Sequence, residues 1–120
     1  MDRQQLLHRC RMALAINRLE QRIDHTLDQC RRFDQMAEPL ETWATQWSTA
    51  TLERWLNLDN LPLEEREKAL VALALQATEE AGAILRAYDP AGAGQDHVLF
   101  HQVACIEWEQ RHRARGTRAA

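Results

Sequence analysis

The side chains best suited to metal chemistry lie near the C-terminal end of this sequence, at helical spacing. They are His97, His101, Cys105 and His112, and Trp108 shares their face. At 100° per residue these positions fall within a narrow arc of one helix. Imidazole and thiolate groups bind zinc, and a His-x-x-x-His spacing places two ligands one turn apart.

One ion cannot reach all of these groups. His97 and Cys105 lie about 12 Å apart along a helix axis. A complete site would need one adjacent pair and a ligand from another segment, such as His8 or His25, but no second pair with matching spacing is present. We therefore expect no bound metal and no cofactor. A small metal-binding or sensor domain that uses this His/Cys face is kept as an alternative function.

Catalytic motifs are weaker still. Glu109-x-x-His112 matches half of a di-iron carboxylate site, but that site needs a second Glu-x-x-His and two further glutamates on facing helices. No Gly-x-Ser-x-Gly or other activated nucleophile occurs. The sequence therefore predicts a protein that is not an enzyme.

The composition indicates the elements that must carry these residues. The chain has 120 residues, of which 45% are hydrophobic and 28% charged, with four Gly and three Pro. Leu and Ala outnumber Val and Ile, which favours helices over strands. We expect an all-α fold, a four- or five-helix, mostly antiparallel bundle with a long N-terminal helix. Residues 1–115 would form this single domain, and residues 116–120 a flexible tail.

Four helical segments are predicted, at about 2–36, 39–58, 63–88 and 97–113. Pro39 should end the first segment and open the second, which could be one helix or two. The third segment carries one long stripe, formed by Leu63, Leu70, Leu73, Ala74, Ala77, Ala81, Ile84 and Tyr88. Asp96 should cap the last helix, whose aliphatic side (Leu99, Val103 and Ile106) should face the core.

The first segment has two apolar faces that point in nearly opposite directions. Ile16, Leu19, Ile23, Leu27, Cys30 and Phe33 share one face, whereas the other holds Leu6, Leu7, Cys10, Ala13 and Leu14. One straight helix cannot turn both faces toward the same neighbour. Either another helix covers the N-terminal face or the helix bends near Ala15, or Leu6, Leu7, Cys10 and Leu14 bind a partner.

Tryptophan marks two further candidate contacts. Trp43 and Trp47 lie one turn apart in the second segment, and Trp108 lies in the last. Tryptophan is common both in cores and as an interface anchor, so core packing and partner binding are both open. Cys10, Cys30 and Cys105 are scattered and odd in number, which is typical of small buried side chains in a reducing compartment.

Charge is distributed unevenly along the chain. Residues 1–36 carry a net charge of +2, residues 37–90 of −6 and residues 91–120 of +1. Acidic residues are interspersed among the arginines, so we do not expect nucleic acid as a direct ligand, and a nucleic-acid-associated accessory role is the weaker alternative. The sequence contains no long apolar run and no signal peptide, so we expect a cytoplasmic protein without a membrane partner.

These patterns together favour a non-enzymatic protein-binding module. We expect a small adaptor, a chaperone-like factor or an inhibitor of a larger machine, with a protein partner and self-association as a homodimer. Its contacts would be Leu6, Leu7, Cys10, Leu14, Trp43, Trp47 and Trp108.

Overall fold

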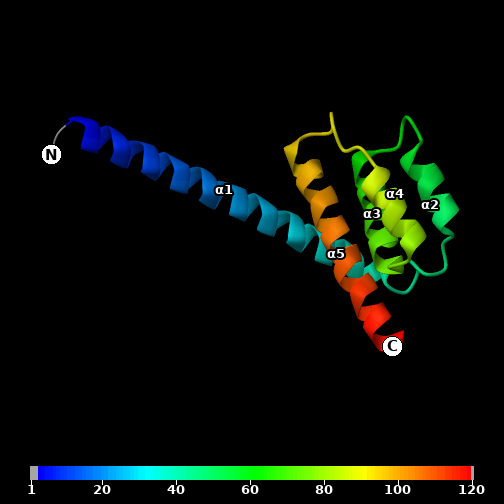
Figure 1. Cartoon of the computed structure of the whole chain (residues 1–120). Helices are drawn as coiled ribbons and strands as arrows, with labels where there is room; N and C mark the ends of the chain where they lie inside the picture. The colour runs from blue at the N-terminus through cyan, green and yellow to red at the C-terminus, as the bar shows by residue number, and fades with distance from the viewer. Residues whose placement is uncertain (1–2, 120) are drawn as a thin grey trace.

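The computed structural model describes residues 3–119, except for the side chains of residues 11, 14, 16, 17, 19, 20 and 117–119. Within that range the chain is all-helical, without a strand. The helices are α1 (Arg3–Leu40), α2 (Thr49–Leu56), α3 (Leu63–Gln76), α4 (Glu79–Ala87) and α5 (Gln95–Ala119). Helices α2 to α5 gather around the C-terminal end of α1, whose N-terminal part extends away from them (Figure 1).

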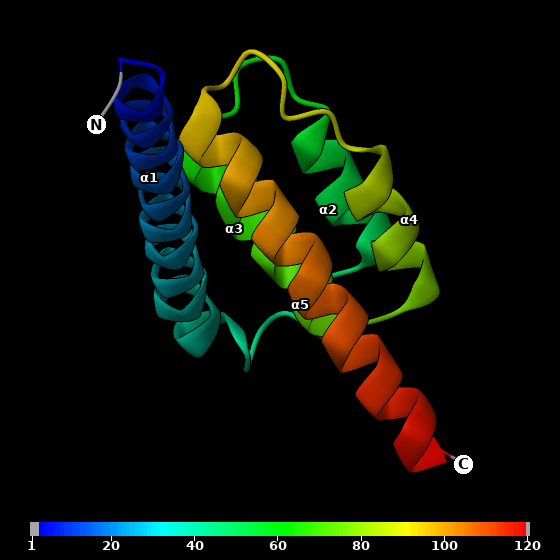
Figure 2. The ribbon, with the colours of Figure 1, turned by 60° about the vertical axis from the view of Figure 1, so that its left-hand side comes forward.

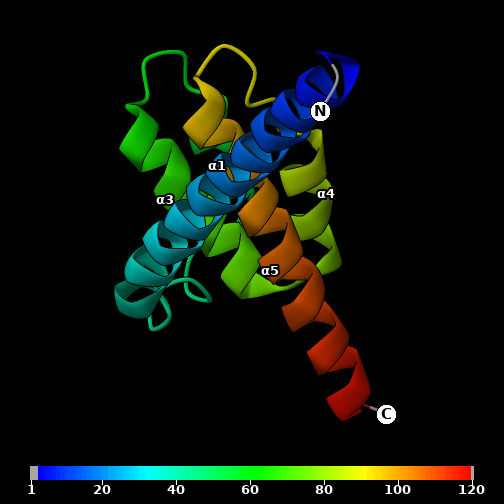
Figure 3. The same cartoon turned by 90° about the vertical axis from the view of Figure 1, so that its left-hand side faces the viewer.

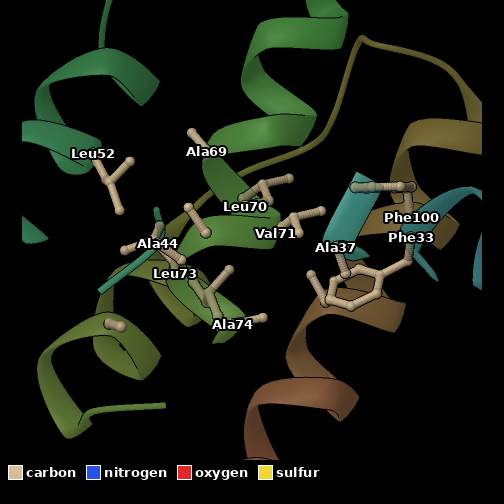
Figure 4. Close-up of a cluster of buried hydrophobic side chains, with 14 of the residues drawn as sticks. Phe33, Ala37, Ala44, Leu52, Ala69, Leu70, Val71, Leu73, Ala74 and Phe100 are labelled. Carbon is tan, nitrogen blue, oxygen red and sulfur yellow. The ribbon is translucent and has the colours of Figure 1, made fainter. Parts of the chain in front are cut away.

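Helix α3 lies at the centre of the packed part and contacts each of the other four helices. Its residues 69–74 are all fully buried and all apolar. A helical segment that is apolar all round is covered on every side, as residues 69–74 of α3 are here. Figure 4 shows Leu70, Val71, Leu73 and Ala74 of α3 inside this core, with Phe33 of α1 and Phe100 of α5 beside them.

The single helix predicted for residues 63–88 is wrong, because the backbone breaks at Ala77. Ala77 adopts a left-handed conformation with φ of 55°, and the Thr78 hydroxyl then caps α4 by accepting from the Ala81 N–H at 3.1 Å. The apolar spacing continues across the break, so the stripe could not reveal it. The signal is Thr78 followed by Glu79 and Glu80, which is typical of a helix start.

Pro39 does not end the first helix, contrary to our prediction. It lies inside the last turn of α1, which ends at Leu40. The cost is small at this position, because proline removes one backbone hydrogen bond where few turns remain to be broken. Residues 41–47 are turns, and the Ser48 side chain caps α2 by accepting from the Thr51 N–H at 3.1 Å. The segment predicted for 39–58 therefore contributes only one short helix.

Helix α5 differs from its prediction in extent and in the faces that it buries. It begins at Gln95, one residue after Gly94 with φ of 98°, and its backbone is helical to Ala119. Figure 2 shows α5 between α1 on one side and α3 and α4 on the other. Ile106, expected in the core, is 53% exposed, whereas His97 is buried. The predicted flexibility of residues 116–120 stays a prediction.

Among the described residues, none of the helices combines the length and the apolar character that crossing a membrane requires.

The contact between α4 and α5 gives a first test. A Cβ at Gly82 would lie 2.2 Å from the Trp108 ring, so Gly82→Ala must displace that ring. We expect a loss of about 1–3 kcal/mol in the free energy of unfolding, as for other overpacked cores. Urea denaturation followed by circular dichroism measures it.

Gly116→Ala is the matched control, because nothing lies within 4 Å of a Cβ at that helical position. It should leave the free energy of unfolding unchanged or raise it by up to about 1 kcal/mol. Equal effects of the two substitutions would contradict the close packing of Trp108 on Gly82.

Candidate partner-binding surface

The first 26 helical residues of α1, residues 3–28, form a projecting segment that we call the arm. Every described side chain in the arm is exposed, and the first buried side chain of α1 is Gln29. At 1.5 Å per residue the arm is about 39 Å long. The radius of gyration of the chain is 18.5 Å, against about 14 Å for a compact chain of this length. Figure 3, which views the molecule from the side of the arm, shows α1 crossing in front of α3 and α5.

The arm carries large apolar side chains that the rest of the chain leaves uncovered. Five of them are 48–55% exposed: Leu6, Leu7, Met12, Ile23 and Leu27. Cys10 is also exposed, contrary to the buried position expected for the cysteines, while the side chain of Leu14 lies outside those described. Further along the same helix Phe33 and Ala37 are in the core. Apolar side chains of α1 that the body covers are thus followed, toward the N-terminus, by apolar side chains that remain about half exposed.

The arm is also basic. Residues 3–28 contain five arginines, one glutamate and two aspartates, a net charge of +2, and all five arginines lie within residues 3–22. Residues 37–90, which include α2, α3 and α4, carry −6. The chain thus separates a cationic projecting helix from an acidic body.

A buried polar network holds the base of the arm to the body. Arg32 of α1 donates to Glu67 of α3 at 2.5 Å, and its guanidinium lies 5.3 Å from the centre of the Phe100 ring in α5. The Glu67 carboxylate is only 2% exposed, and its second oxygen lies 3.4 Å from Nδ1 of His97. A neutral His97 that donates from Nδ1 to Glu67 accepts at Nε2 from the Tyr88 hydroxyl, at 2.7 Å. Three helices, α1, α3 and α5, thus meet around one carboxylate, and Tyr88 at the end of α4 holds its histidine.

Burial lowers the pKa of His97, and the hydrogen bond with Glu67 opposes this shift without reversing it. His97 is therefore neutral in the folded protein at pH 7. A neutral His97 does not compensate the negative charge of the Glu67 carboxylate. Arg32 is the cation that compensates the buried Glu67 carboxylate.

The other residues of the His/Cys face also contact the chain itself. His101 Nε2 donates to the Leu85 carbonyl at 2.6 Å, and the Cys105 sulfur lies 3.6 Å from the same nitrogen. Burial raises the pKa of the Cys105 thiol, which disfavours the thiolate that a metal requires. No group of three or more potential metal ligands occurs among the described residues.

The C-terminal half of α5 binds the end of α3 through three successive carbonyls. Trp108 donates to the carbonyl of Thr78 at 2.7 Å, His112 to that of Ala77 at 2.9 Å, and Arg115 to that of Gln76 at 2.6 Å. The Gln76 and Ala77 carbonyls lie at the end of α3, where no further helical N–H follows, whereas the Thr78 carbonyl also accepts from the Gly82 N–H of α4 at 3.0 Å. Trp108, predicted as a partner contact, and His112, a candidate metal ligand, thus contribute to the fold.

The other two predicted tryptophans occupy different environments. Trp43 is 53% exposed on the turns that follow α1. Trp47 is partly buried, with its ring centre 5.7 Å from that of Trp55, and both border an apolar groove of about 550 Å³. Met36, Pro39 and Leu40 of α1 complete its apolar lining. The groove lies at the opposite end of α1 from the exposed apolar residues of the arm, so it forms a separate surface.

Sequence reasoning missed Arg32 and Glu67 as central residues. A signal was present, because Glu67 lies four residues after Leu63 and three before Leu70, within the apolar stripe of the third segment. A charged residue at such a position is buried only when it is paired. Its partner lies 35 positions away in the chain, and no local pattern identifies it.

The network predicts that removing the Arg32 cation destabilises the fold. Arg32→Met leaves the Glu67 carboxylate buried without its cation, and should lower the free energy of unfolding by roughly 2 kcal/mol or more. Arg31→Met is the neighbouring control, because Arg31 is paired with exposed Asp28 and its loss should cost less than about 0.5 kcal/mol. Urea denaturation measures the free energy of unfolding of both variants. A similarly small decrease in the two variants would contradict the pairing of Arg32 with Glu67.

The lowered pKa of His97 predicts a pH dependence of stability. The unfolded chain, with His97 near 6.5, binds a proton that the folded chain rejects, so the free energy of unfolding should fall as the pH drops below about 6.5. His97→Gln should flatten this dependence between pH 7 and pH 5.5. His8→Gln, in the arm, should leave it unchanged, and an identical slope in all three proteins would contradict the role of His97.

No protein-family model matches this chain, and searches of curated proteins and of solved structures return no significant match.

Proposed function

We propose that this protein is a non-enzymatic protein-binding module that binds through its arm. The observation that carries the proposal is the row of half-exposed Leu, Met and Ile side chains on a helix that extends from the body. Contiguous exposed apolar surface in a protein commonly marks an interface. The body, a four- or five-helix and mostly antiparallel bundle, would serve as the base that presents the arm.

An uncovered helix also lacks most of what stabilises helices in proteins. The arm has no core of its own, and isolated helices are marginal in water because packing supplies most of their stability. A partner that covers the apolar residues would supply that packing. An amphipathic helix of this kind binds either in a hydrophobic groove or against another helix. Such a contact suits a small adaptor, a chaperone-like factor or an inhibitor of a larger machine.

The alternatives have less support. The metal-binding or sensor reading requires the His/Cys face, whose members are used in contacts with Glu67, Leu85 and Ala77. The nucleic-acid reading is supported by the basic charge of the arm, because phosphate binding requires cations. It leaves Leu6, Ile23 and Leu27 unexplained, since phosphates do not cover apolar side chains. A protein surface accounts for both the apolar and the charged residues.

Substitutions on the arm test the proposal. The full chain is immobilised and exposed to a nuclease-treated lysate of the organism that encodes it. A Leu6→Glu, Ile23→Glu double variant should capture its protein partner at least tenfold less, since two apolar contacts of about 1.5 kcal/mol each are lost. Its free energy of unfolding should match the unsubstituted protein, because both side chains are exposed.

Leu58→Glu is the matched control, since Leu58 is half exposed on the body and receives the same substitution. It should not affect capture. Equal capture by the double variant and the unsubstituted protein would overturn the proposal. Retention of short duplex DNA or RNA with a steep loss as salt is raised, and no arm-dependent protein, would instead support the nucleic-acid role.

A further inference from the structure

We infer that the arm pairs with the arm of a second copy of this chain as an antiparallel two-helix coiled coil. The inference rests on the proposed function and names its partner. Met12 and Ile23 are half exposed on the arm, and the sequence places Ile16 and Leu19 between them at alternating spacings of four, three and four residues. This spacing is the apolar repeat of a coiled coil. Ile16 and Leu19 enter through their sequence positions alone.

The same repeat continues into the core of the chain itself. With Thr26 as a polar exception, it passes through Cys30 to Phe33 and Ala37, which α3 and α5 cover. The body thus covers the C-terminal part of one repeat and leaves its described N-terminal apolar positions, Met12 and Ile23, about half exposed. The uncovered part is what a second helix would occupy.

The four apolar positions are self-complementary when two arms run in opposite directions. If the midpoint lies between residues 17 and 18, Met12 faces Ile23 of the second copy, and Ile16 faces Leu19 of the second copy. If Ile16 and Ile23 are the a positions of the heptad, Met12 and Leu19 are the d positions. Both pairs therefore join an a position to a d position, as in antiparallel coiled coils. At the side of this seam Leu6 lies against Leu27 of the second copy, so two further exposed leucines cover each other. A two-fold axis generates each contact twice.

Charge favours the antiparallel direction over the parallel one. Arg9 falls on the same repeat, three residues before Met12. Parallel arms would set Arg9 against Arg9 and join two segments, residues 3–11, that each carry +3. Antiparallel arms set Arg9 against Thr26 and place residues 3–11 beside residues 24–32, whose net charge is zero. Like charges across such a seam repel, so the antiparallel arrangement is the stable one.

The shape of the chain permits this pairing. The N-terminal end of the arm points away from the body (Figure 1), so two antiparallel arms place the bodies at opposite ends of the pair. The start of α5 lies beside one side of the arm, where His25 is 3.8 Å from Asp96 and Arg18 and Arg22 border a pocket with Leu99. Met12 and Ile23 lie on another side of the helix and are half exposed, so the start of α5 does not cover the proposed seam at these two positions.

Cross-linking of the full chain tests the direction and the register. Cys10, Cys30 and Cys105 are replaced by serine, and two variants are made in that background, Met12→Cys and Ile23→Cys. In this register residue 12 of one copy lies beside residue 23 of the other. The two residues 12 are therefore separated by 11 residues along the pair, about 16 Å, and so are the two residues 23. With a thiol reagent shorter than that separation, we expect cross-linked dimers only when the two variants are mixed. Light scattering should show a dimer, and circular dichroism should show unchanged folding.

Each other result overturns the inference in a recognisable way. Cross-links within each single variant would show parallel arms, and a dimer without cross-links would show another register or another interface. A monomer at high micromolar concentration would exclude arm pairing. A monomer that still captures a protein through Leu6 and Ile23 would overturn the inference while leaving the proposed function intact. The Leu6→Glu, Ile23→Glu double variant, expected to be monomeric, and the Leu58→Glu variant, expected to remain dimeric, are the matched controls.

Discussion

The pairing of Arg32 with Glu67 is the constraint on which the arrangement of the chain depends. The carboxylate is almost fully desolvated, so it must remain beside its cation and its histidine. Buried ion pairs contribute little net stability, but they tolerate few geometries. Since Arg32 can reach Glu67 only at one rotation of α1 about its axis, the pair selects which face of that helix is turned to α3 and α5. The face that the arm presents is selected by the same contact, because α1 has no Gly or Pro between Arg3 and Glu38.

A second requirement of the fold is to hold its two short helices in place. Helices α2 and α4 have only 8 and 9 residues and are marginal without tertiary contacts. The Gln76 side chain donates to the carbonyls of Ala44 and Trp47, and so ties the turns before α2 to the end of α3. Trp108, His112 and Arg115 cover the break between α3 and α4. Polar side chains therefore stabilise the irregular backbone, while alanine and leucine in α3 fill the core.

Part of this could be predicted from the sequence. The scarcity of Val, Ile, Gly and Pro was sufficient for the all-helical class. The break at Ala77 was not predictable from apolar spacing, because the stripe continues through it. The His/Cys face was recognised as a cluster, but its members bind carbonyls and a carboxylate brought there by tertiary packing. The two opposed faces of the first helix were visible in the sequence. That the body covers α1 only from Gln29 onward, and leaves the described apolar side chains of the arm exposed, depends on contacts between distant segments.

One consequence of the arm concerns its own persistence. A helix held only by its backbone hydrogen bonds opens locally at little cost in free energy, whereas the core opens only with global unfolding. By mass action, the fraction of arms that are helical depends on the concentration of the partner that binds them. A copy without a bound partner therefore exposes a locally unfolding, arginine-containing segment to proteases and chaperones. In a copy with a bound partner this segment is covered. The lifetime of the protein in the cell would then follow the abundance of its partner.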